Sequence, residues 1–150
     1  MKKLIILCLL CALAVLLHFK CDAQPHFNMG AGYDIKTQKP VGCIAAGYTV
    51  AHLITLQGSI QASLTRQANV NNYFGGSAGL YLPVAQNMQI IPAAGYYYNL
   101  RNGDDKSQNT AAIGYSLTYN LIINTNGGIY ARALYIERSV QLTAGFHVVF

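Results

Sequence analysis

The chain has 150 residues, enough for one domain, and it carries ten Lys and Arg against five Asp and Glu, a formal net charge of +5. Only 10% of the residues are charged, whereas soluble domains carry about 25%. Three of the cations and one of the acids fall in the first 23 residues, which leaves a net charge of +3 on scattered side chains. The remaining cations form no basic patch of the kind that binds nucleic acid, so no nucleic-acid partner is expected.

The start of the chain has the pattern of a secretory signal peptide. Lys2–Lys3 form a basic beginning, residues 4–17 are uncharged and apolar, and the small residues Cys21 and Ala23 precede a cleavage that would leave Gln24 first. Fourteen apolar residues are too few for a membrane-spanning helix, which needs about 20. A lipoprotein anchored through the cysteine is the alternative, but the bulky and basic residues before that cysteine disfavour it.

We therefore expect export through the general secretory pathway and two segments, a signal peptide over residues 1–23 and one domain over residues 24–150. Cys43 is the only cysteine of that domain. An internal disulfide framework and a cysteine-based zinc site are thereby excluded, and the thiol is expected to be a small packing group.

The domain alternates between apolar and polar side chains with period two. Because the side chains of a strand point alternately to its two faces, each such segment is predicted to be a strand with one apolar face. The other face holds mainly Gly, Ser, Thr, Asn and Gln. Eight segments show this pattern, at residues 27–35, 43–50, 54–65, 73–84, 88–101, 110–121, 129–137 and 140–150. No stretch has a helical period, so the expected fold class is all-β, an eight-stranded antiparallel up-and-down β-barrel.

The connections between these segments alternate between longer polar joins and tighter turns. Longer joins follow the first, third and fifth segments, and tight turns follow the second, fourth and sixth. A membrane barrel with both chain ends in the periplasm has this arrangement, with short turns on the near side and longer loops outside. The join around residues 137–139 is the exception, because it should be an outer loop and is very short.

Period two does not decide which face is buried, since a soluble lipocalin-like barrel has the same alternation turned inside out. Three features favour lipid on the apolar side. The few charges lie mostly in or beside the joins, and the Gln-rich face of the third segment could not form a soluble core. Eleven tyrosines with no tryptophan fit an interfacial aromatic girdle, although tyrosine is also a good strand former.

The last segment ends on Phe146, Val148 and Phe150, in phase with its apolar face. With the alternation and the aromatic content, this ending makes residues 24–150 resemble a small eight-stranded outer-membrane β-barrel of the type of OmpX and the OmpA transmembrane domain. The resemblance implies a transmembrane β-barrel in which these three residues form the insertion signal recognised by the barrel-assembly machinery. Phe150 is then expected to close the barrel against the strand that contains Phe27.

Two segments depart from the pattern. Pro92 lies inside the fifth segment, where it removes a donor from the hydrogen-bond ladder, so a bulge or a gap in pairing is expected there. The seventh segment alternates poorly, because Leu134, Tyr135 and Ile136 are consecutive and apolar, which leaves its register open.

Three charges are in phase with the polar faces, namely Asp34, Arg101 and Arg132. A charge inside a narrow barrel is costly unless it is paired, so we expect a contact of Asp34 with Arg132 or with Arg101. Eight strands leave an interior just wide enough for side chains to fill, which disfavours a diffusion porin.

No constellation for catalysis or metal binding is convincing. Residues 75–79 match G-x-S-x-G around Ser77, followed by Asp104 or Asp105 and by His147, but that motif needs a strand-to-helix turn and this chain continues as a strand. Outer-membrane lipid A deacylases carry a His-x-Ser pair near the chain end, and His147 lacks the serine. His26, His52 and His147 lack metal-ligand spacing. We expect no catalytic residue, no metal and no cofactor.

The sequence thus predicts an integral outer-membrane protein of a diderm bacterium with a structural or surface-interaction role. Its expected partners are outer-membrane lipid, the barrel-assembly machinery during insertion and other envelope proteins. Three alternatives remain, namely an outer-membrane component of a secretion or conjugative-transfer apparatus, a lipid-modifying barrel enzyme, and a soluble periplasmic or secreted β-barrel.

Overall fold

The computed structural model describes residues 23–65, 70–102 and 110–150. The expected signal peptide, apart from Ala23, lies outside these residues, and so do Asp104 and Asp105. Within the described ranges, no helix is long and apolar enough to cross a membrane.

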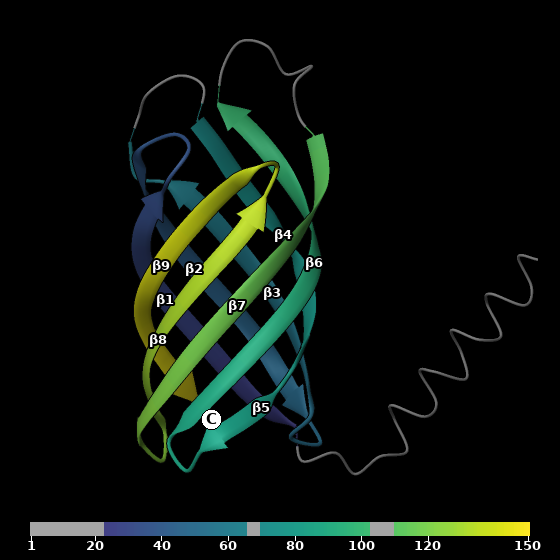
Figure 1. Cartoon of the computed structure of the whole chain (residues 1–150), viewed down its shortest axis with the longest axis vertical. Coiled ribbons are helices and arrows are strands. Elements are labelled where there is room, and N and C mark those ends of the chain that lie inside the picture. The colour runs from purple at the N-terminus through teal and green to yellow at the C-terminus, as the bar shows by residue number, and fades with distance from the viewer. Residues whose placement is uncertain (1–22, 66–69, 103–109) are drawn as a thin grey trace, which may run out of the picture.

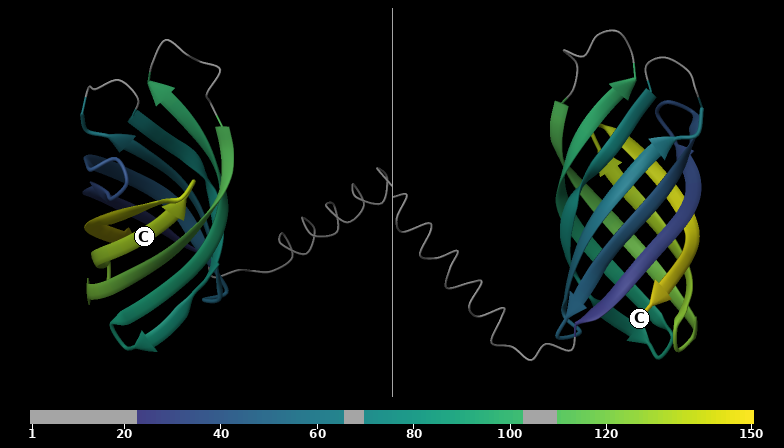
Figure 2. Two further views of the ribbon diagram at one scale, coloured as in Figure 1. Left: turned by 45° about the horizontal axis from the view of Figure 1, so that its top comes forward. Right: turned by 180° about the vertical axis from the view of Figure 1, so that it is seen from behind.

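The described chain forms one closed antiparallel β-barrel with tilted strands (Figure 1; Figure 2). Consecutive strands pair around the wall, β9 pairs with β1, and β4 pairs with β6. Because β4 and β5 are two parts of one long strand, the barrel wall consists of eight strands, as the sequence predicts. The strands are β1 (Gln24–Asp34), β2 (Lys39–Val50), β3 (Ile54–Ser63), β4 (Val70–Leu80), β5 (Leu82–Ala85), β6 (Met88–Asn102), β7 (Thr110–Asn124), β8 (Gly127–Ile136) and β9 (Ser139–Val149).

Closure brings the two ends of the domain together. The backbone N–H of Phe150 donates to the carbonyl of Pro25 at 3.0 Å, and His147 lies opposite Asn28 in the ladder. The expectation that the last residue closes the barrel against the first strand is confirmed. We call the end that holds Gln24 and Phe150 the terminal end, and the opposite end, which holds the β1–β2 and β8–β9 hairpins, the hairpin end.

The gap expected at Pro92 is present. Gly79 pairs with Ala93 and Leu82 pairs with Ile90, but the ladder leaves out Leu80 and Tyr81 between them. The register is the same on both sides of the gap, so the proline interrupts the hydrogen bonds without shifting the strands. The N–H of Tyr81 donates instead to the carbonyl of Leu53 at 2.7 Å.

The two faces of the wall are the reverse of those in a soluble barrel. Outward side chains are large and apolar, and Ile60, Ile113 and Phe146 each leave more than half of their surface exposed, at 61%, 61% and 67%. Inward side chains are mostly polar and buried. They include His26, Asn28, Asp34, Thr49, Thr55, Ser59, Gln61, Gln89, Asn99, Ser116, Thr118, Asn120, Arg132, Ser139, Gln141, Thr143 and His147. An exterior of this kind is stable only against hydrocarbon.

The structure fixes the register of β8, which the sequence left open. Tyr135 points outward, while Leu134 and Ile136 point inward and pack with Tyr73 and Tyr97 in a buried apolar cluster. The poor alternation therefore arises because the lumen at this level is filled by apolar side chains as well as polar ones.

The tyrosines are shared between the two faces. Tyr33, Tyr48 and Tyr135 point outward near strand ends, where a girdle is expected, and other outward tyrosines lie further along the strands. Tyr73 and Tyr97 are instead buried in the lumen, together with Tyr130. The girdle interpretation thus covers only part of the tyrosine content.

Candidate functional site

The hairpin end of the lumen is bridged by Glu137, which lies in the tight turn between β8 and β9. Its carboxylate accepts hydrogen bonds from Asn99 Nδ2 at 2.8 Å, from Tyr73 Oη at 3.2 Å and from Thr110 Oγ1. These donors stand on β6, β4 and β7, so one side chain ties the turn to three strands of the wall. Charge-assisted bonds of this kind are about twice as strong as neutral ones.

The turn that presents this carboxylate has an unusual backbone. Glu137 and Arg138 have φ angles of 48° and 61°, the left-handed region that two-residue hairpin turns of type I′ require. Asn and Gly normally occupy such turns because other residues lose about 1–2 kcal/mol there. The hydrogen bonds of the carboxylate compensate for a backbone that the sequence alone does not favour.

Asp34 is buried at the same end, as the sequence predicts for a lumen charge. Its carboxylate accepts from Ser139 Oγ at 2.8 Å, from Gln141 Nε2 at 3.1 Å and from the backbone N–H of Thr37 at 2.9 Å. These bonds fasten the β1–β2 hairpin to β9, the strand that closes the barrel. The carboxylate is therefore satisfied by neutral donors.

Arg132 is buried in the lumen too, with 3% of its surface exposed. Its Nη2 donates to Tyr97 Oη at 2.9 Å, and its Nε and Nη1 have no hydrogen-bond partner in the described structure. No ion pair between Asp34 and Arg132 is present, so that expected pairing is wrong, because neutral groups of β9 and the hairpin already surround the carboxylate. The side chain of Arg101, the other expected partner, lies outside the described residues.

The middle of the lumen is filled by the ring of Tyr97. A Cβ added to Gly114 on β7 would lie 2.9 Å from this ring, and one added to Gly75 on β4 would also lie 2.9 Å from it. The ring therefore lies against two glycines on the strands that flank its own. The buried side chains of Leu134 and Arg132 lie beside it in the lumen.

The terminal end of the lumen holds two histidines. His26 on β1 and His147 on β9 are buried, and their ring centroids are 5.9 Å apart. His147 Nδ1 donates to Asn28 Oδ1 at 2.6 Å. A small cavity of about 20 Å³ lies beside them, lined in part by Asn120 and Gln89.

Solved structures share this barrel, although neither a family model nor a curated protein matches the sequence. The Yersinia pestis outer membrane protein Ail, solved in a phospholipid bilayer nanodisc, matches with a TM-score of 0.60 at 11% identity, over 86% of this chain and 100% of that chain. Ail in complex with the heparin analogue sucrose octasulfate matches with a TM-score of 0.55 at 12% identity, over 83% and 98% of the two chains. A de novo designed transmembrane β-barrel gives 0.64 at 11% identity, over 87% and 98%. The chain has the fold of a small outer-membrane β-barrel.

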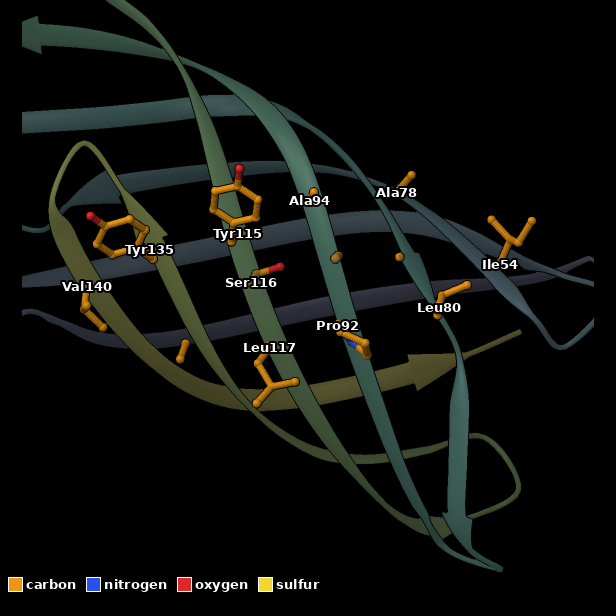
Figure 3. A pocket seen from close by; sticks show the side chains of 13 residues that line it. Ile54, Ala78, Leu80, Pro92, Ala94, Tyr115, Ser116, Leu117, Tyr135 and Val140 are labelled. Carbon is orange, nitrogen blue, oxygen red and sulfur yellow. The ribbon is translucent and has the colours of Figure 1, made fainter.

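The outer wall of this outer-membrane-type barrel carries an apolar groove of about 780 Å³. Figure 3 shows Pro92 and Ala94 on β6 in its middle, with the larger Tyr115, Leu117 and Tyr135 beside them. The groove exists because the floor consists of small side chains next to the break between β4 and β5. In a bilayer, such a hollow is filled by lipid chains.

The three residues of the expected insertion signal lie on the outer face of β9 or just beyond it. Phe146 and Phe150 leave 67% and 78% of their surface exposed. Val148, which lies between them in the sequence, is half-buried. These three apolar residues stand at alternate positions on one face, and their role as an insertion signal stays a prediction. Ala23 and Gln24, the expected cleavage site, are exposed at the terminal end.

The structure does not bring the G-x-S-x-G serine to His147. Ser77 stands on β4 and His147 on β9, and these strands lie on opposite sides of the barrel, separated by β3, β2 and β1. His147 is already hydrogen-bonded to Asn28. Gly75, Ser77 and Gly79 alternate along the inner face of β4, which fits their interpretation as lumen residues.

Two clusters escaped the sequence analysis. The role of Glu137 could have been predicted from the sequence, because a carboxylate in a very short join between two strands has to stay close to the mouth of the barrel. No sequence feature predicts that His26 and His147 lie close together, since this proximity depends on the pairing of β9 with β1.

Proposed function

We propose that the protein is an integral outer-membrane β-barrel whose role is structural or in surface interaction, and that it is not a diffusion pore. The filled lumen carries this proposal. Tyr73, Tyr97, Leu134 and Ile136 are almost completely buried within the barrel, and Glu137 spans the hairpin end. An eight-stranded barrel has little interior space beyond its side chains, so these groups leave no aqueous path for a solute.

The assignment to the outer membrane rests on the reversed faces of the wall and on the fold shared with Ail. Outer-membrane lipid would cover the apolar band. Export would follow removal of residues 1–23, and the barrel-assembly machinery would recognise Phe146, Val148 and Phe150. An even number of strands brings both ends of the barrel domain to the terminal end, and the short turns β2–β3, β5–β6 and β7–β8 there support a periplasmic position for this end, with the hairpin end outside.

The surface role would fall to the hairpin end. Lys36 and Arg138 are exposed there, and Lys39 is half-buried beside them. The short β1–β2 and β8–β9 hairpins that carry them offer a small contact area, which fits an envelope protein partner better than an elaborate adhesin. A place in a secretion or conjugative-transfer apparatus would use the same surface, but no feature of the described residues favours it specifically.

We further infer that the barrel is not an enzyme. The separation of Ser77 from His147 supports this, because nucleophilic catalysis needs a base within hydrogen-bond reach of the nucleophile. Lipid A from cells that express Ser77→Ala or His147→Gln should be identical by mass spectrometry to lipid A from cells with the unchanged protein. A modified lipid A that depends on either side chain would restore the enzyme hypothesis.

Membrane integration and pore closure can be tested together. The protein should be extracted from the outer-membrane fraction with detergent and should shift in gel mobility on heating, as folded barrels do. Reconstituted in planar bilayers, it should give no steady conductance. Recovery in the soluble periplasm would contradict membrane integration, and stable ion-conducting openings would contradict the closed lumen.

A further inference from the structure

The two histidines at the terminal end face the same small space inside the barrel. His26 and His147 have 6% and 4% of their surface exposed, and their rings are tilted by 41° at a centroid separation of 5.9 Å. Asn28 lies opposite His147 in the β1–β9 ladder, so His26, two residues before Asn28, is the diagonal neighbour of His147 on the same inner face. Imidazoles at this separation can turn one nitrogen each toward a common ion.

The surroundings of His147 fix which of its nitrogens is free. Its Nδ1–H donates to Asn28 Oδ1 at 2.6 Å, so Nε2 carries the lone pair. Histidines that bind metals almost always donate their other N–H to an oxygen acceptor, which sets the tautomer and the ring orientation. Asn28 thus holds His147 in the form that a metal ligand requires.

The adjoining cavity supplies both room and a further donor atom. Its volume of about 20 Å³ is enough for an ion or a single water. Asn120 lines it, has 1% of its surface exposed, and its Oδ1 has no hydrogen-bond partner in the described structure. A buried amide oxygen is unfavourable when it lacks a partner, so this oxygen is available as a third ligand.

We propose that this cavity binds one divalent transition-metal ion of the zinc and copper class. His26 and His147 each supply an imidazole nitrogen, Asn120 Oδ1 supplies an oxygen, and water completes the coordination. Imidazole suits zinc, copper and nickel, whereas calcium and magnesium take sets of oxygen ligands. No three His, Cys, Asp or Glu side chains converge anywhere in the described residues, which is why the third protein ligand has to be an amide.

The site differs from a simple chelate at the start of the chain. If export removes residues 1–23, the α-amino group of Gln24 stands at the rim of the same cavity, with His26 in third position. The planar copper chelate of such termini needs deprotonated amides from the second and third residues, and Pro25 has no amide hydrogen. A contribution from His147 therefore distinguishes the proposed site from terminal chelation.

The test uses the tag-free protein extracted from membranes in detergent, titrated with Zn²⁺ by calorimetry and with Cu²⁺ by electron paramagnetic resonance. We expect one ion per barrel and nitrogen hyperfine structure from two imidazoles. His147→Gln and His26→Gln should each weaken Zn²⁺ binding by about tenfold or more, as even outer-shell changes do, and should leave the signal of one imidazole. Asn120→Ala should weaken binding less.

His52→Gln is the matched control, because His52 is exposed in the turn between β2 and β3. It should leave both affinity and spectrum unchanged, and the heat-modifiable gel shift should show that every variant folds. Should one histidine variant fail to fold, the other still tests the site. The proposal is overturned if the unchanged protein binds no stoichiometric ion, if both lumen variants retain full affinity, or if His52→Gln removes binding.

Discussion

Glu137 Oε2 accepts a hydrogen bond from Asn99 Nδ2 at 2.8 Å across the hairpin end of the lumen. The two residues are 38 positions apart and belong to a turn and to β6. Through this bond and those from Tyr73 and Thr110, the last hairpin is tied to β6, β4 and β7. The turn between β8 and β9, which is very short for an outer loop, thus connects strands of the wall through the hydrogen bonds of its carboxylate.

Removal of this carboxylate should loosen the hairpin end. Glu137→Ala removes the shared acceptor of the hydrogen bonds from Asn99, Tyr73 and Thr110, and we expect a loss of about 1–3 kcal/mol in the free energy of unfolding. Urea unfolding in lipid vesicles measures it. Glu137→Gln keeps an acceptor oxygen without the charge and should lose less, so equal stability of all three proteins would contradict the fastening role.

The neighbouring residue should respond in the opposite direction. Arg138 has a φ of 61°, and a glycine there would relieve a backbone conformation that costs other residues about 1–2 kcal/mol. Arg138→Gly should therefore raise the free energy of unfolding by up to about 1 kcal/mol, with part of the gain offset by the flexibility of glycine in the unfolded chain. A loss of stability would show that the arginine side chain makes an essential contact.

The close approach of Tyr97 to Gly114 predicts a strong effect of a single methyl group. A Cβ on Gly114 would lie 2.9 Å from the tyrosine ring, so Gly114→Ala should displace the ring and cost about 1–3 kcal/mol, as overpacking does. Gly58→Ala is the control, because its Cβ would meet no atom closer than 4.0 Å. Equal unfolding curves for the two variants would contradict the packing of the lumen.

The hydroxyl of the same tyrosine should matter independently of its ring. Tyr97→Phe removes the hydrogen bond to Arg132 Nη2 and leaves the buried guanidinium with one partner fewer. We expect a loss of about 1–3 kcal/mol, measured by the midpoint of urea unfolding. Tyr96→Phe changes the next residue along β6, whose side chain is 63% exposed outside the barrel, and should be close to neutral.

The sequence predicted those features of the fold that depend on the residues of a single strand. Alternation assigned the inner and outer faces, and Pro92 marked the gap in the ladder, because both follow from local backbone chemistry. It also predicted that Asp34 faces the lumen. The partner of that carboxylate could not be predicted, since Ser139 lies 105 residues away and meets it only after closure.

The seventh segment shows a different limit of the sequence. Leu134 and Ile136 are as apolar as the lipid-facing residues, so composition does not show which face they occupy. Only the register with β7 and β9 shows that they fill the lumen beside Tyr73 and Tyr97. Likewise, His26 and His147 come together through strand pairing, which period two does not determine.

The central claim is that the apolar face of the wall meets lipid. Spin labels at Ile60→Cys and Ile113→Cys, in a Cys43→Ala background in bilayers, report directly whether each position meets lipid or water. Both residues are 61% exposed on the outer wall. We predict high accessibility to molecular oxygen and almost none to a water-soluble nickel complex at both positions. Ready collision of the labels with the nickel complex would contradict the account.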